Sequence, residues 1–135
     1  MKRGRGSLSF FPTPMIQRPY EHLIVWQEAH TLCRNVHDLL KQFPGEERHE
    51  LSSQIHQAAY SVPMNIVEAN MKRTKKAKLN FLNHSEASLE ELDYQLLLSR
   101  DFQYISQEQF ERIRNQVGKV SYLLNRFRSG IESKK

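Results

Sequence analysis

The sequence predicts an all-α protein, an antiparallel up-down-up-down four-helix bundle with a flexible basic N-terminal arm. Apolar residues recur three and four positions apart over four successive segments, the spacing that lines one face of a helix. No segment of useful length alternates apolar and polar residues as a half-buried strand does. The five glycines and five prolines lie mostly between these segments, and the short connections favour antiparallel neighbours.

Residues 1–19 are expected to form the disordered arm. They hold four cations and no acid, namely Lys2, Arg3, Arg5 and Arg18, and their glycines and prolines oppose regular structure. The apolar stretch is short and is broken by Pro12 and Pro14, so it fits neither a signal peptide nor a membrane span. We therefore expect a cytoplasmic protein with no membrane partner. A single cysteine, Cys33, agrees with a reducing compartment.

The first two helices are expected on either side of the Pro44-Gly45 pair, which favours a turn. The apolar face of the first consists of Val25, Ala29, Leu32, Val36, Leu39 and Phe43. That of the second consists of Leu51, Ile55, Ala58, Val62, Ile66 and Ala69. Glu46 and Glu47 suit the positive N-terminal end of the second helix, and Pro63 is expected to bend it and free the carbonyl of Ala59.

The last two helices are predicted by their N-terminal caps as well as by periodicity. Thr74 is a candidate N-cap for a third helix that ends near Phe102, and Ser106 with Gln109 forms a capping-box signature for the fourth. The third helix presents Leu82, Ser85, Leu89, Leu92, Leu96 and Ser99. The fourth presents Phe110, Ile113, Val117, Val120, Leu124, Phe127 and Ile131. The bundle is therefore expected over residues 20–130, followed by a C-terminal tail of residues 131–135.

Helices three and four carry more apolar surface than one bundle face requires. The excess comes from two runs of consecutive residues, Leu96-Leu97-Leu98 and Tyr122-Leu123-Leu124. Either these helices are deeply buried within one chain, or the surplus surface packs against another copy. The second explanation predicts a homo-oligomer with four contact residues, Leu97, Leu98, Tyr122 and Leu123.

Positive charge is concentrated at the junction of the second and third helices. Five cations lie within seven residues there, namely Lys72, Arg73, Lys75, Lys76 and Lys78. With the four cations of the arm they carry nine positive charges against a chain total of +5, so the remainder carries −4. Clustered cations beside a helix start can contact phosphate oxygens without reading base sequence. The alternative is a solvated junction. The expected nucleic-acid contacts are these five residues together with Lys2, Arg3 and Arg5.

No combination of residues predicts catalysis, metal binding or a cofactor. His30 and His37, and likewise His49 and His56, lie seven apart, whereas helical ligand pairs usually lie four apart. A di-iron bundle needs a Glu-x-x-His motif on each of two helices, and the sequence has this spacing only at Glu46 and His49. Cys33 fits a small buried apolar residue. Without a phosphate loop or a nucleophile elbow, we expect a protein that is not an enzyme.

Asn65, Glu68 and Glu91 are expected to have structural roles. Asn65 lies among apolar residues, where its amide would satisfy the backbone freed by Pro63 or fix the register of the helices. Glu68 would hold the end of the second helix in position. A pocket with perturbed carboxylates around Glu68 and Glu91 would instead favour an enzyme.

Several segments carry a family resemblance through their order and spacing. They are Leu23-Ile24-Val25-Trp26 with Ala29 and Leu32, Phe43-Pro44, Leu51-x-x-Gln54-Ile55, Pro63-x-Asn65-Ile66-x-Glu68 and Ser88-x-x-Glu91-Leu92. Over about residues 20 to 128 the chain resembles the four-helix-bundle proteins encoded in 23S rRNA intervening sequences. The same superfamily includes the accessory variability determinant proteins of diversity-generating retroelements. The sequence departs from the family pattern at Ala69 and Ala87, where glycine is common.

The resemblance implies a small non-enzymatic bundle that assembles into a ring, typically a pentamer, with a basic surface suited to RNA or DNA. In the retroelement relatives the ring also contacts a reverse transcriptase. Together, charge and resemblance predict an oligomeric protein that binds nucleic acid mainly through phosphates. The alternative is a protein-interaction module, for example one that binds a reverse transcriptase, with no direct role on nucleic acid.

Overall fold

The computed structural model describes residues 17–47 and 50–135, and over these ranges it confirms the all-helical four-helix bundle. A short 3-10 turn, η1 (Pro19–His22), precedes α1 (Ile24–Leu39). Two further 3-10 turns, η2 (Leu40–Gln42) and η3 (Gly45–Glu47), lead to α2 (Leu51–Met71). The chain continues as α3 (Lys75–Asp101) and α4 (Gln107–Glu132). No strand occurs in these ranges.

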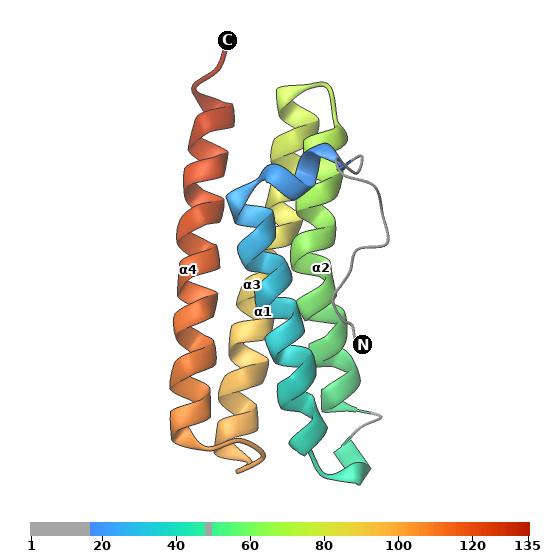
Figure 1. Ribbon diagram of the computed structural model, residues 1–135, viewed down its shortest axis with the longest axis vertical. Coiled ribbons are helices and arrows are strands. Elements are labelled where there is room, and N and C mark those ends of the chain that lie inside the picture. The colour runs from blue at the N-terminus through green and yellow to red at the C-terminus, as the bar shows by residue number, and fades with distance from the viewer. Residues whose placement is uncertain (1–16, 48–49) are drawn as a thin grey trace.

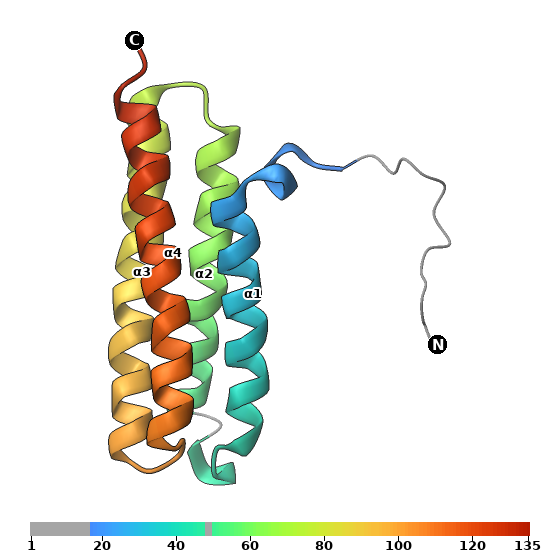
Figure 2. The same cartoon turned by 60° about the vertical axis from the view of Figure 1, so that its left-hand side comes forward.

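Each helix runs antiparallel to the one before it, as the ribbon shows (Figure 1). Around the bundle, α1 packs against α2 and α4, and α3 packs against the same two helices. The start of α1, the connection from α2 to α3 and the end of α4 lie toward one end (Figure 2). The other two connections lie at the opposite end. This arrangement brings segments together that are far apart in the sequence.

The N-terminal caps of α3 and α4 confirm the sequence prediction. The Thr74 hydroxyl accepts a hydrogen bond from the backbone N–H of Ala77 at 3.1 Å. Ser106 and Gln109 form a full capping box, with bonds of 3.0 Å and 2.8 Å. Both caps satisfy backbone donors that the first turn of a helix leaves without partners. The local sequence therefore fixes where these two helices begin.

Three boundaries differ from the prediction. Glu46 and Glu47 belong to η3, and α2 begins at Leu51 with no acid in its first turn, because residues 45–47 form a turn of their own. The change to 3-10 geometry after Leu39 buries Leu40 and leaves Leu39 half-buried. The last helix extends to Glu132, where the backbone N–H of Ser133 still bonds the carbonyl of Ser129 at 3.0 Å.

The core consists mainly of the apolar stripes that the sequence predicts. Its largest fully buried apolar side chains are Leu32, Val36, Ile55, Val62, Ile66, Leu82, Leu89, Leu92, Leu96, Val120 and Leu124. At the end of the last stripe, Phe127 and Ile131 are half-buried against the core. Burial of this surface is the main term that stabilises the bundle.

Pro63 lies inside α2 and is buried. Beside it, the buried Ser85 hydroxyl donates a hydrogen bond to the carbonyl of Val62 at 2.8 Å. Asn65 instead donates to the carbonyl and the hydroxyl of Ser61, both at 2.9 Å. The expectation that Asn65 satisfies the carbonyl freed by Pro63 is therefore wrong, since its amide reaches one turn back and not to Ala59.

Candidate nucleic-acid interface

The five cations of the α2–α3 junction begin at the C-cap of α2 and extend through the first turn of α3. Lys72 is the C-cap residue of α2, and Lys75 is the first residue of α3 after the Thr74 cap. The connection is thus only three residues long, residues 72–74. Because it is so short, its cations are held close to two helix ends rather than on a long loop.

Three of the five cations contact groups within the chain. Lys72 pairs with Glu68 at 3.5 Å and lies over the ring of Phe81, 4.9 Å from its centroid. Lys78 donates to the carbonyls of Ala69 and Asn70 at 3.4 Å and 3.5 Å. These carbonyls belong to the last turn of α2, and that of Ala69 also accepts the backbone N–H of Lys72 at 3.3 Å. A lysine at this position therefore stabilises the helix end.

Lys75 has the third internal contact, and this contact reaches another helix. Its ammonium donates to the carbonyl of Glu132 at 3.1 Å, at the last residue of α4. This bond links the junction to the C-terminal end of the chain. The cluster that looks uniform in sequence is thus partly engaged in holding the bundle together.

Arg73 and Lys76 differ from these three, because both are exposed and neither has a bonded or charged partner among the described residues. Lys76 is the second residue of α3, so its backbone N–H also lies in the first turn, where amides lack intrahelical acceptors. An Arg side chain can bind a phosphate through two parallel hydrogen bonds. These two side chains are the junction cations most available to an external anion.

The sequence analysis missed Lys134 and Lys135. Both follow the end of α4 and are exposed, and the Lys75–Glu132 bond places them beside the junction. Arg18 is exposed just before η1, which contacts α2. We call this surface the basic end, and its residues are Arg18, Lys72, Arg73, Lys75, Lys76, Lys78, Lys134 and Lys135. The predicted antiparallel topology already placed these segments at one end and would have identified the set.

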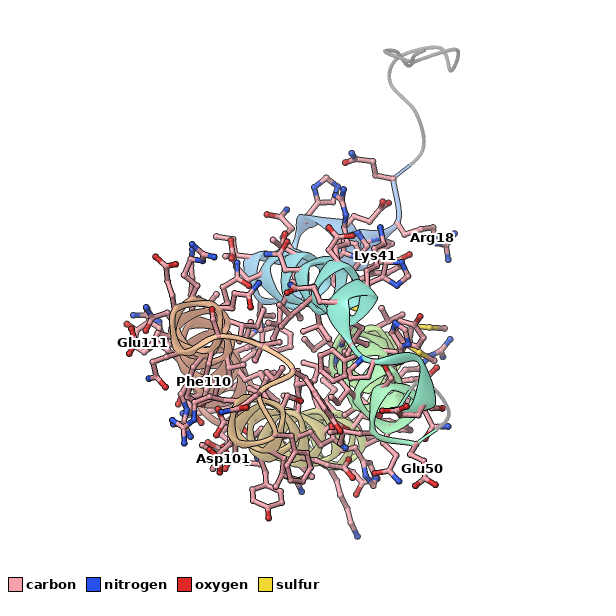
Figure 3. All side chains as sticks on the ribbon, turned by 90° about the horizontal axis from the view of Figure 1, so that it is seen from below. Arg18, Lys41, Glu50, Asp101, Phe110 and Glu111 are labelled. Atoms are coloured by element: carbon pink, nitrogen blue, oxygen red, sulfur yellow. The ribbon has the colours of Figure 1, made fainter. Side chains whose placement is uncertain are left out.

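At the opposite end of the bundle, acidic residues outnumber basic ones among the described residues. Among its described residues are six acids, Asp38, Glu46, Glu50, Asp101, Glu108 and Glu111, and three cations, Lys41, Arg100 and Arg112. Figure 3 views the molecule from this end and labels four of them, Lys41, Glu50, Asp101 and Glu111. The charge of the described residues is therefore polarised along the long axis of the bundle.

Two arginines of α4 are engaged with α3 and do not add to the free charge. Arg114 bonds both carboxylate oxygens of Asp93, at 3.0 Å and 2.7 Å. This hydrogen bond and the Asp93 charge raise the pKa of the Arg114 guanidinium. Arg128 bonds both oxygens of Glu86, at 3.1 Å and 2.9 Å. These two bidentate pairs connect α3 to α4 at two separate places along the helices.

The three polar residues singled out in the sequence do not form one site. Asn65 and Glu91 line a shallow hollow between α2 and α3, together with Ser61, Phe81, His84, Ala87 and Ser88. Inside it, the hydroxyls of Ser61 and Ser88 bond at 2.7 Å. Glu68 does not line this hollow, and its carboxylate pairs with Lys72 at 3.5 Å.

The predicted oligomer contacts divide into two kinds. Leu97 and Leu123 are half-buried and pack against the core of their own chain. Leu98 is half-buried outside that core set, and Tyr122 is 58% exposed. The Tyr122 hydroxyl accepts a hydrogen bond from Arg126 at 3.1 Å. Of the four predicted contacts, Leu98 and Tyr122 are therefore the two that do not pack against the core of their own chain.

Lys2, Arg3 and Arg5, the predicted contacts in the arm, lie outside the described residues. Within the described ranges, no helix is long and apolar enough to cross a membrane. Nor does that part of the chain gather three or more His, Cys, Asp or Glu side chains in a group able to hold a metal ion.

Comparisons with known proteins agree with the bundle. The model of the family described as 23S rRNA-intervening sequence protein matches residues 21–126. A crystal structure from Bacteroides thetaiotaomicron, described as a protein with unknown function from the S23 ribosomal protein family, is similar with a TM-score of 0.72. It is 27% identical, and the match covers 82% of this chain and 96% of that one. The comparison with curated proteins gives no match.

Proposed function

This chain belongs to the family of 23S rRNA-intervening sequence proteins, and we propose that it is a non-enzymatic protein that binds RNA or DNA through phosphates at its basic end. The observation that carries the proposal is the convergence of three separate segments at that end. Four of its cations, Arg73, Lys76, Lys134 and Lys135, are exposed and have no side-chain partner among the described residues. Lysine and arginine side chains supply affinity for phosphates in a manner that does not depend on base sequence.

Some cations are bonded within the chain and others are free, and this difference also supports binding at the end of the bundle rather than along its side. Lys75 and Lys78 bond the ends of α4 and α2, and the four free cations lie in or directly beside these helix ends. The bidentate pairs of Arg114 and Arg128 neutralise positive charge on the α3–α4 side. The basic end therefore offers a phosphate backbone a denser group of unpaired cations than the α3–α4 side does.

We expect affinity for nucleic acid to depend steeply on salt. A protein that makes four phosphate contacts loses about 50-fold to about 150-fold in affinity between about 50 mM and about 200 mM salt, the lower value being for single strands. Fluorescence anisotropy with labelled single- and double-stranded RNA and DNA of several sequences measures this slope. We expect little difference between sequences of one type, because phosphates carry no base information.

A matched control for this experiment is the double variant Lys41→Ala/Arg112→Ala, which removes two charges from the opposite end. Its affinity should equal that of the unmodified protein at every salt concentration. Absence of binding at the lowest salt, or binding that does not change with salt, would contradict the proposed function.

We also propose that the chain self-associates, as a pentamer by its resemblance to the family. Light scattering coupled to gel filtration should then give about five times the chain mass of 16.0 kDa at micromolar concentration. Leu98→Glu, which places a charge on the half-buried outer side of α3, should shift the particle toward the monomer, whereas Gln57→Glu on α2 should not. A monomeric unmodified protein would contradict self-association.

The second candidate function is a protein-interaction module, for example one that binds a reverse transcriptase. The exposed side chain of Tyr122 favours it, because exposed aromatic residues are common at protein interfaces. Loss of a protein partner on Tyr122→Ala, with nucleic-acid affinity unchanged, would separate this function from the first.

A further inference from the structure

Two histidines meet at the contact between α1 and α2. The Nδ1 atom of His37 on α1 lies 3.2 Å from the Nε2 atom of His56 on α2. Their ring centroids are 5.3 Å apart, and His56 also stacks on Tyr60 with a centroid distance of 5.4 Å. The sequence offered no sign of this pair, because the two residues are nineteen positions apart. The pair plays no part in the nucleic-acid interface.

The separation of these nitrogens matches the spacing of two ligands on one metal ion. Zinc–imidazole bonds of about 2.0 to 2.1 Å at a tetrahedral angle place the two nitrogens about 3.3 Å apart, and a right angle places them about 2.9 Å apart. The observed 3.2 Å lies between these values. The two rings extend from adjacent helices, α1 and α2, which fix the backbone on both sides of the pair.

Both rings are accessible and suited to ligation. His37 is exposed and His56 is half-buried, so an ion reaches them from solvent without opening the core. Burial, and secondly the charge of His37, lower the pKa of His56. Imidazole binds a metal ion in its neutral form, through the lone pair of one ring nitrogen.

The surroundings supply no further strong ligand but leave room for water. The hollow beside His37 is lined by Cys33, Arg34, Asp38 and Tyr60. Burial raises the pKa of the Cys33 thiol, which opposes formation of the thiolate that metals bind. The Asp38 carboxylate is paired with Lys41 at 3.3 Å. The Arg34 charge weakens the attraction of a cation, so the two imidazoles must supply most of the affinity.

From this geometry we propose that His37 and His56 form a binding site for a divalent transition metal ion, Zn²⁺ or Ni²⁺, with water at the remaining positions. Imidazole is a preferred ligand of both ions. The ion replaces the hydrogen bond between the rings, and each ring then carries its proton on the nitrogen that does not bind the metal. Because its ligands come from α1 and α2, the bound ion connects the two helices and stabilises the folded chain.

The test is a calorimetric titration of Zn²⁺ into the full-length protein, free of any purification tag and treated beforehand with a chelator. The unmodified protein should bind one ion per chain. His37→Gln and His56→Gln should each lower the affinity by about tenfold or more, because a single imidazole lacks the second ligand held at high effective concentration. The matched control is His84→Gln, which removes an exposed histidine of α3 and should leave the affinity unchanged.

A second measurement needs no variant and remains informative even if a substitution disturbs folding. Small amounts of paramagnetic Ni²⁺ added to the unmodified protein should broaden the ring signals of His37 and His56 before those of the other four histidines in NMR spectra. Equal broadening of all six histidines, or an affinity for Zn²⁺ that survives both glutamine substitutions, would overturn the proposal. Either outcome leaves nucleic-acid binding at the basic end unaffected, since the two surfaces are separate.

Discussion

Replacement of Leu92 by alanine is expected to lower the free energy of unfolding by about 2 to 5 kcal/mol. Leu92 lies near the middle of α3 and is 0% exposed, so removal of its side chain leaves a cavity that its neighbours cannot fill without shifting. Domains of this size have total stabilities of about 5 to 15 kcal/mol, so the loss is a large fraction of the total. Urea denaturation followed by circular dichroism at fixed protein concentration measures the change.

The control for this change is Leu98→Ala on the same helix. Leu98 is half-buried and does not belong to the core set, so the same chemical deletion should cost clearly less. Both variants are compared at the lowest concentration that the assay allows, because self-association adds a concentration-dependent term. Equal losses at the two positions would contradict the assignment of the core.

Removal of the four free cations of the basic end is expected to abolish most of the affinity for nucleic acid. In the quadruple variant Arg73→Ala/Lys76→Ala/Lys134→Ala/Lys135→Ala, affinity at about 50 mM salt should fall by about 100-fold or more, and the salt slope should decrease by about three to four. Each of these side chains is exposed and has no side-chain partner in the described ranges, so the stability of the fold should change little. Fluorescence anisotropy over a salt series measures both quantities.

A second quadruple variant with the same change in net charge tests whether the position of the cations, and not only the total charge, determines affinity. Arg34→Ala/Lys41→Ala/Arg112→Ala/Lys119→Ala removes four exposed cations away from the basic end, among them the partners of Asp38 and Glu28 in surface ion pairs. Such pairs contribute little to stability, so this variant should also fold. An equal loss of affinity in both variants would show that overall charge, and not the basic end, determines binding.

Lys75 differs from the four free cations because it has a partner inside the chain. This residue looks identical to Lys76 in the sequence, yet its ammonium bonds the carbonyl of Glu132 while that of Lys76 has no partner in the described part of the chain. Periodicity cannot distinguish the two, because the partner of Lys75 lies fifty-seven residues away. The same reason explains why Lys134 and Lys135 were missed. Charge clusters are sought along the sequence, whereas this surface is assembled from three segments.

The sequence by itself determined the number of helices, their antiparallel order and most of the core. It also located the starts of α3 and α4, since hydrophobic periodicity and capping act over a few residues and need no information from the rest of the chain. The tertiary structure alone decided which cations are free and that His37 meets His56. These properties depend on contacts between helices, where the partner of a side chain is set by packing and not by its neighbours in sequence.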